Sequence, residues 1–148
     1  MSYTISKDFA WSASHVLNGL PQGHQCGRLH GHNYVARVIL TSDELDATGF
    51  VVDYGELVFV KDFIDDTWDH RHLNDAVPFT TMNATAENMA RTLAYYVHDV
   101  LASAGFATVQ VSVSISETPK TWSTFRMPYM TGYGHSDRHA QSRVGGPL

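Results

Sequence analysis

The sequence predicts an α+β domain in which four antiparallel strands form a sheet and two helices cover one of its faces. Residues 3–15 and 109–117 alternate between apolar and other side chains, which is the period of a strand with one buried face. Between them, residues 53–66 and 86–102 carry apolar side chains at helical spacing. Two strands before a pair of helices and two after it give the order β-β-α-α-β-β, which favours an antiparallel sheet with both helices on one side.

The first half of the chain is predicted to pair two strands across a long loop. The strand over residues 3–15 ends at His15, which shares the face of its apolar residues. Glycine, proline and asparagine then mark a loop over residues 18–31, and loops of that length within a domain are usually functional. β-branched and aromatic residues predict the second strand over residues 32–41.

The second half has recognisable helix starts and one unusual carboxylate. Asp53 is a candidate N-cap for the first helix, and Thr85 is one for the second. Glu117 continues the apolar face at the end of the third strand, where a carboxylate needs a partner. It either binds a cationic or amide-bearing ligand or forms an ion pair with a cation such as Lys120. A last strand is predicted over residues 122–127.

Length and composition limit the class of protein. The 148 residues, 43% of them hydrophobic, suffice for one domain, predicted over residues 1–130, followed by a polar tail over residues 131–148 that we expect to be mobile. A formal net charge of −5 argues against nucleic-acid binding through phosphates. No apolar run approaches the roughly 20 residues of a membrane helix, and the N-terminus lacks a secretory pattern. With a single cysteine, these features predict a cytoplasmic protein without membrane association.

Three histidines form a candidate metal site. His30 and His32 are two residues apart, so both imidazoles point to one face if this stretch is a strand. His15 ends the preceding strand on its apolar face, and antiparallel pairing can bring it alongside. Three imidazoles with one open position are typical of a catalytic zinc site. His24, in the middle of the loop, is a weaker alternative for the third ligand.

Two loop segments carry further candidates for chemistry. Cys26 lies in a glycine- and histidine-rich loop, where a nearby cation would favour the thiolate, so it is a candidate base or nucleophile. Coordination of the metal by its sulfur is the alternative. Asp69 could orient the adjacent imidazole of His70 within a loop, as in a catalytic triad. His72 competes with His70 for this role, and a solvated polar loop is the simpler interpretation of the segment.

Six segments of the chain occur in a specific combination. They are Phe9–His15, Cys26–Tyr34, Gly49–Tyr54, Asp69–Asn74, Thr85–Asn88 and Glu117–Thr118. In this order they resemble the 6-pyruvoyl-tetrahydropterin synthase and 6-carboxytetrahydropterin synthase family, from residue 5 to about residue 127. The resemblance implies a tunnelling fold whose subunits form a homohexamer, a dimer of trimers, with active sites between subunits. Asn83-Ala84 stands where the family often has proline, and we expect this to loosen the start of the second helix.

The resemblance also implies roles for individual residues in a zinc-dependent active site. The implied ligands of Zn²⁺ are His15, His30 and His32. The implied catalytic residues are Cys26, Asp69 and His70. The residues implied to bind the pterin are Glu117 and Thr85.

The spacing within the cysteine motif favours one reaction of the family. Three residues separate Cys26 from His30, which resembles the bacterial 6-carboxytetrahydropterin synthases of the queuosine and 7-deazapurine route, whereas the animal pyruvoyl type has a longer gap. The expected activity is that of a carbon–oxygen lyase, which converts 7,8-dihydroneopterin triphosphate to 6-carboxy-5,6,7,8-tetrahydropterin, acetaldehyde and triphosphate. The alternatives are 6-pyruvoyl-tetrahydropterin synthase and, from another class, a non-catalytic zinc-binding assembly protein. Arg28, Arg71 and Lys120 are candidate contacts of the triphosphate.

Overall fold

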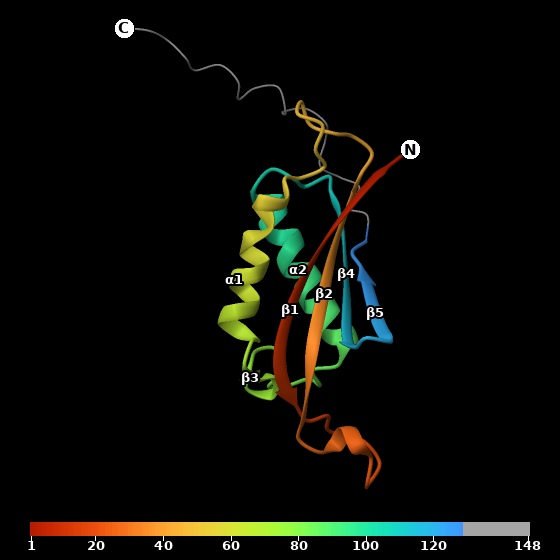
Figure 1. The fold of residues 1–148 in the computed structure, drawn as a ribbon, viewed down its shortest axis with the longest axis vertical. Coiled ribbons are helices and arrows are strands. Elements are labelled where there is room, and N and C mark those ends of the chain that lie inside the picture. Colours follow the sequence, from red (N-terminus) through yellow and green to blue (C-terminus); the bar gives the residue numbers. More distant parts are fainter. Residues whose placement is uncertain (129–148) are drawn as a thin grey trace, which may run out of the picture.

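The computed structural model describes residues 1–128, which form a five-stranded sheet with two helices on one face (Figure 1). The strands are β1 (Tyr3–His15), β2 (His30–Ser42), β3 (Arg71–His72), β4 (Gln110–Thr118) and β5 (Thr121–Arg126). The helices are α1 (Val58–Thr67) and α2 (Ala86–Ser103). The strand order is β3-β1-β2-β4-β5, and every pair is antiparallel except β3 with β1.

The predicted tunnelling fold, with four antiparallel strands and two helices on one face, is confirmed. The structure adds β3, whose two residues pair parallel to β1 and are too few to show a periodic pattern. The predicted tail over residues 131–148 lies outside the described residues, and the single domain over residues 1–130 stays a prediction. Among residues 1–128, neither helix is long and apolar enough to span a bilayer.

The two predicted N-caps differ in what they cap. The Asp53 side chain accepts a hydrogen bond from the Gly55 amide, so a 3-10 helix (Tyr54–Leu57) precedes α1 where the sequence predicts an α-helix from its first turn. Thr85 caps α2 as predicted, because its Oγ1 accepts a hydrogen bond from the Asn88 amide. The Asn88 side chain also donates to the carbonyl of Asn83 at 2.9 Å. Two hydrogen bonds therefore hold the start of α2, and its loosening relative to relatives with proline stays a prediction.

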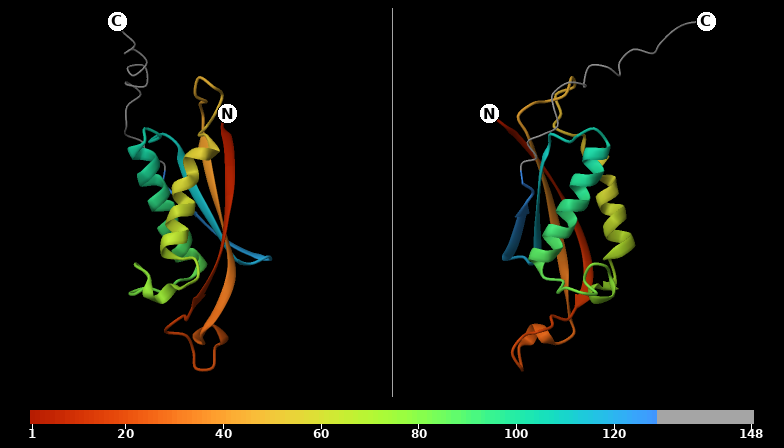
Figure 2. Two further views of the ribbon diagram at one scale, coloured as in Figure 1. Left: turned by 60° about the vertical axis from the view of Figure 1, so that its left-hand side comes forward. Right: turned by 180° about the vertical axis from the view of Figure 1, so that it is seen from behind.

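The two helices lie over one face of the sheet (Figure 2). A layer of aromatic and aliphatic side chains fills the space between them. Trp11 of β1 stacks on Tyr34 of β2 with ring centroids 5.2 Å apart, and its ring lies 5.6 Å from that of Trp68. From α2, Leu93 and Val97 are fully buried against this layer. Burying this apolar face is what fixes which side of each strand points toward the helices.

The register of β1 with β2 brings the histidines to one end of the sheet. His15 pairs with His30, and Ala13 pairs with His32. Between the two histidines of β2 lies Gly31, where an added Cβ would meet the carbonyl oxygen of Ala13 at 3.0 Å. The close approach of the strands at this point therefore favours glycine, and it keeps the three imidazoles together.

Replacing Leu93 by alanine should lower the free energy of unfolding by about 2–5 kcal/mol, because the buried side chain would leave a cavity between α2 and the sheet. Urea unfolding followed by circular dichroism measures the change. Leu29→Ala is the matched control, since the Leu29 side chain is 69% exposed and its removal should cost less than about 0.5 kcal/mol. Equal losses in the two variants would contradict this assignment of the core.

Candidate active site

The three histidines predicted to bind metal meet where β1 and β2 end. His15 is only 1% exposed, and His30 and His32 are partly buried. One ring nitrogen from each lies within 4.8 Å of the other two, and the Nε2 atoms of His15 and His30 are 3.0 Å apart. Among residues 1–128, this is the one group of three or more histidine, cysteine or acidic side chains close enough to share a metal ion.

Hydrogen bonds determine which nitrogen each ring turns toward the cluster. His15 Nδ1 lies 2.8 Å from the carbonyl oxygen of Ala84, and His30 Nδ1 lies 2.7 Å from that of Arg28. A carbonyl oxygen only accepts, so both Nδ1 atoms carry protons and both Nε2 atoms of the neutral rings present lone pairs. Two lone pairs 3.0 Å apart repel each other, and a shared cation would remove that repulsion.

His32 completes a donor set that fits a metal ion. The backbone of Glu117 acts to raise the pKa of this ring, and the His32 Nε2 is buried without a hydrogen-bond partner in the described part of the chain. Burial lowers the pKa of both His15 and His32, which keeps these rings neutral, as metal ligands must be. Three imidazoles and no fourth side-chain ligand within residues 1–128 correspond to a metal site with an open position.

The two residues predicted to bind the pterin lie beside the histidines. Burial raises the pKa of the Glu117 carboxyl, while the nearby His15 and His30 act in the opposite direction. Within residues 1–128, no ion pair joins Glu117 to Lys120, the alternative partner considered above. Thr85 follows directly on the residue whose carbonyl orients His15, and its oxygen accepts the Asn88 amide proton at 3.3 Å. The Thr85 hydroxyl can therefore donate its own proton to a ligand.

Cys26 lies in the loop between β1 and β2. This loop forms the lower end of the molecule in Figure 1. It is partly buried and belongs to a 3-10 helix (Gln25–Gly27). His24 caps this helix, because its Nδ1 accepts a hydrogen bond from the Cys26 amide at 3.1 Å. The structure thus gives His24 a local role and excludes it from the histidine cluster, and the sulfur of Cys26 does not belong to that cluster either.

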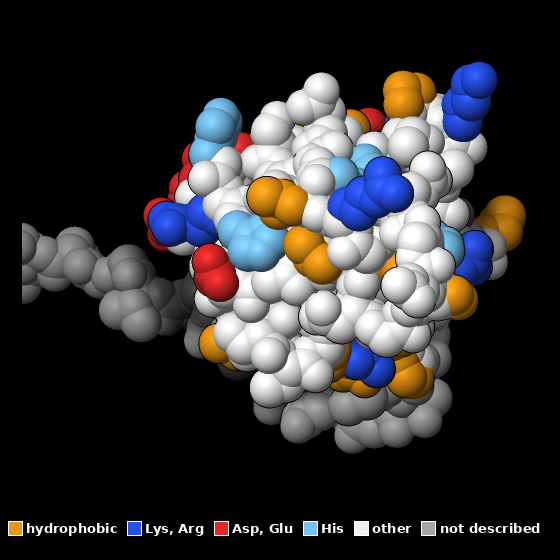
Figure 3. Space-filling model, turned by 90° about the horizontal axis from the view of Figure 1, so that it is seen from below, with side chains coloured by type: hydrophobic (Ala, Val, Ile, Leu, Met, Phe, Trp, Pro, Cys, Tyr) orange, Lys and Arg blue, Asp and Glu red, His pale blue; other side chains and the backbone are white. Residues whose placement is uncertain are grey.

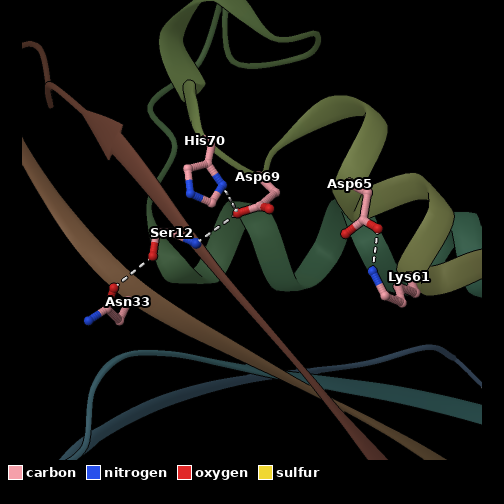
Figure 4. A network of polar contacts seen from close by, with 6 residues as sticks. All are labelled: Ser12, Asn33, Lys61, Asp65, Asp69 and His70. Carbon is pink, nitrogen blue, oxygen red and sulfur yellow. Dashed lines mark hydrogen bonds and ion pairs between the residues drawn. The ribbon is translucent and has the colours of Figure 1, made fainter.

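Asp69 and His70 form the predicted pair, which is docked on the edge of β1 (Figure 4). Asp69 Oδ1 lies 2.8 Å from His70 Nδ1 and accepts a hydrogen bond from the Ser12 amide at 3.1 Å. The His70 amide donates to the Ser12 carbonyl at 2.7 Å. These bonds hold His70 at a φ of 54°, an uncommon conformation for a residue with a side chain. The Ser12 amide and His70 both lower the pKa of Asp69, which keeps its carboxylate charged.

The structure does not bring this pair to Cys26 within one chain. No hydrogen bond or ion pair within residues 1–128 joins Asp69 or His70 to Cys26. The His70 side chain is 82% exposed and borders an open pocket of about 490 Å³, together with Ser12, Ser14 and Arg71. Figure 3 shows this end of the molecule, where histidine and basic side chains lie at the surface among uncharged ones.

Comparisons with known proteins agree with this geometry. The family model of 6-pyruvoyl tetrahydropterin synthase matches residues 4–128. A Bacillus subtilis (strain 168) protein named 6-carboxy-5,6,7,8-tetrahydropterin synthase is 31% identical over 129 residues, which cover 84% of this chain and 86% of that protein. A Halobacterium salinarum protein named as a probable enzyme of the same kind is 36% identical over 126 residues, covering 73% and 76%. The structure of Caenorhabditis elegans 6-pyruvoyl tetrahydropterin synthase superposes with a TM-score of 0.71 at 30% identity, covering 86% and 97%.

The fold and the site together define a tunnelling-fold protein with a cluster of three histidines that can bind a metal ion. The chain belongs to the 6-pyruvoyl tetrahydropterin synthase family. This is a family of pterin synthases of the lyase type, which is consistent with a pterin substrate.

We expect the purified chain to bind about one Zn²⁺ or Co²⁺ ion per subunit. His32→Ala should weaken this affinity by more than about 100-fold, because losing a ligand costs more than losing an outer contact of one. Mass spectrometry of bound metal and titration of the cobalt absorption bands measure stoichiometry and affinity. His98→Ala removes an imidazole of α2 that lies outside the cluster, so its affinity should equal that of the unmodified chain. An unchanged affinity in His32→Ala would rule out the site.

Proposed function

We propose that the protein is a zinc-dependent carbon–oxygen lyase that converts 7,8-dihydroneopterin triphosphate to 6-carboxy-5,6,7,8-tetrahydropterin, acetaldehyde and triphosphate. The observation that carries the proposal is the group of three ring nitrogens of His15, His30 and His32 beside the half-buried Glu117. The relatives named 6-carboxy-5,6,7,8-tetrahydropterin synthase and the short spacing between Cys26 and His30 support this reaction. We place the enzyme in the cytoplasm, on a route to queuosine or another 7-deazapurine.

Glu117 and Thr85 would hold the pterin ring. The carboxylate of Glu117 accepts hydrogen bonds from the amino group and ring N–H groups of the pterin. Because burial disfavours the charged carboxylate on its own, these donors replace the lost water and make the site selective for a ring that carries them. The Thr85 hydroxyl donates to a pterin acceptor, since its oxygen is already occupied by the Asn88 amide.

Cys26 would move protons at the side-chain carbons of the substrate. His15, His30 and His32 would hold a Zn²⁺ ion, which would supply Lewis-acid polarisation of the substrate's side-chain hydroxyls. Cys26 acts beside it as the thiolate, taking a proton from carbon and returning it at a later step. The hydrogen bond from the Leu17 amide to the Cys26 carbonyl, at 2.9 Å, helps to hold the residue in place.

We assign Asp69 and His70 to the active site of a neighbouring subunit. In their own chain they lie on the edge of β1 with the His70 ring open to solvent, and no contact links them to Cys26 within residues 1–128. A homohexamer built as a dimer of trimers, as the family resemblance implies, would supply the pair from another chain. Asp69 keeps the His70 ring oriented by accepting a hydrogen bond from its Nδ1–H group. The Nε2 atom of His70 then exchanges protons with the substrate.

A second candidate is 6-pyruvoyl-tetrahydropterin synthase. It is favoured by the structural likeness to the Caenorhabditis elegans protein of that name, at 30% identity. The two reactions share the substrate and the pterin contacts, and they differ in whether the side chain loses two carbons. A non-catalytic zinc-binding assembly protein would retain the histidine cluster and would have no use for a thiolate at Cys26.

Incubating the zinc-loaded protein with 7,8-dihydroneopterin triphosphate should give 6-carboxy-5,6,7,8-tetrahydropterin and acetaldehyde in equal amounts. Mass spectrometry identifies the pterin, and a hydrazine reagent traps the aldehyde. Cys26→Ala should slow turnover by at least about 100-fold, because it removes the acid–base group, and it should retain its zinc. A pyruvoyl pterin without acetaldehyde would favour the second candidate. No turnover by the unmodified protein would favour the assembly protein.

Mixing two inactive variants tests whether the subunits share their active sites. Cys26→Ala and His70→Ala should each be inactive alone, whereas co-expression with different tags should restore roughly one quarter of the activity per site, as random pairing of two chains predicts. A site regains function when one chain supplies Cys26 and its neighbour supplies His70. If both residues act within one chain, the mixed oligomers stay inactive, and the assignment to a neighbouring subunit is wrong.

A further inference from the structure

Two asparagine side chains form hydrogen bonds with the backbone at the start of the loop that contains Cys26. The Asn74 amide accepts a hydrogen bond from the amide of Val16 and donates one to its carbonyl, both at 2.9 Å. The Asn83 amide does the same for Asn18, at 2.8 and 2.9 Å. Each asparagine thus reproduces the pair of hydrogen bonds that a neighbouring strand would offer to a single residue.

Leu17, between the two residues that the asparagines bind, is hydrogen-bonded directly to Cys26. Alternate residues of an extended chain direct their backbone groups to opposite sides. Val16 and Asn18 meet the asparagines, and the amide of Leu17 donates to the carbonyl of Cys26 at 2.9 Å. The short stretch 16–18 is therefore held between two asparagine amides and the backbone of the cysteine.

Hydrophobic packing does not hold this loop. None of residues 16–29 is buried, and the 3-10 helix that contains Cys26 has no buried residue. The order of the loop therefore depends on hydrogen bonds. Four bonds from Asn74 and Asn83 connect its start to the rest of the fold, and the bond from His30 Nδ1 to the Arg28 carbonyl connects its end to β2. An asparagine amide suits this task because it offers one donor and one acceptor side by side.

One of these asparagines also belongs to the segment that orients the histidine cluster. Asn83 precedes Ala84, whose carbonyl accepts the Nδ1 proton of His15 at 2.8 Å. The Asn83 carbonyl is itself fixed by the side chain of Asn88 in the first turn of α2. The loop of Cys26 and the ring of His15 are thus attached to the same short stretch of backbone.

We propose that Asn74 and Asn83 are positioning residues for Cys26. They fix the backbone of residues 16–18, to which the Cys26 carbonyl is hydrogen-bonded through Leu17. The location of Cys26 relative to His15 is thereby fixed. The inference rests on the proposed catalytic role of Cys26, and it assigns to the two asparagines a function in the reaction without contact with the substrate.

Amide hydrogen exchange tests this placement without any substrate. In Asn74→Ala and in Asn83→Ala, exchange of the Leu17 amide should accelerate by about tenfold or more, since two hydrogen bonds that order its neighbours are lost. Alkylation of Cys26 by iodoacetamide, which reports on one thiol because the chain has one cysteine, should accelerate in parallel. Turnover should fall through kcat with KM and bound zinc per chain unchanged, whereas a general loss of folded protein would lower bound zinc in proportion to kcat.

Matched variants separate placement of Cys26 from loss of fold. Asp46→Ala removes side-chain bonds to the Thr48 and Phe50 amides in the loop at the opposite end of the sheet, and it should leave Leu17 exchange, alkylation and kcat unchanged. Asn83→Asp retains the acceptor for the Asn18 amide and loses the donor, so its effects should lie between those of the unmodified chain and Asn83→Ala. This variant keeps the test valid if Asn83→Ala does not fold.

Leu17 protection and alkylation rates in both alanine variants equal to those of the unmodified chain would overturn the proposal. The same holds if exchange accelerates and kcat does not change. An unmodified protein that fails to turn over the pterin, but whose asparagine variants release Leu17 and Cys26, would refute the proposed function alone, because placement of the thiol would stand.

Discussion

The pairing of His15 with His30 at the last position of the β1–β2 register is the constraint on which the site depends. The period of a strand is two, so a slip of one residue would turn either histidine to the opposite face. The stacking of Trp11 on Tyr34 opposes such a slip, because the slip would expose one of these two buried rings. The same packing that stabilises the sheet therefore holds three imidazoles within reach of one ion.

The site is divided between two surfaces of the same strand. The face of β1 toward the helices carries His15, whereas its outer edge carries Asp69 and His70 through backbone contacts with Ser12. Within one chain, groups on the face of β1 cannot meet groups bound at its edge. The proposed enzyme would therefore need a second chain, and the edge formed by β3 is where that chain would reach the pair.

Sequence periodicity predicted those parts of the structure that depend on local patterns. The alternation in β1 and the two-residue spacing of His30 and His32 sufficed to place the three histidines together, and Thr85 was recognisable as a helix cap. Periodicity could not predict β3, whose two residues have no pattern of their own. The contacts of Asn74 with Val16 and of Asn83 with Asn18 join residues 58 and 65 positions apart. Neither segment has a sequence pattern that predicts these contacts. The pairing of Asp69 with His70 was predictable, but its distance from Cys26 depends on the whole fold.

The stretch 83–85 has a consequence for how the chain tolerates changes of length. Asn83 is hydrogen-bonded to the loop that contains Cys26, the Ala84 carbonyl to the His15 ring, and Thr85 to the first turn of α2. Inserting or deleting one residue there would shift all three connections at once, and no neighbouring side chain could restore them. At the far end of the sheet, the exposed loop over residues 43–50 is pinned mainly by Asp46 to its own backbone. Added segments such as tags or reporter loops therefore belong at residues 43–50, while 83–85 should keep its length in every functional relative.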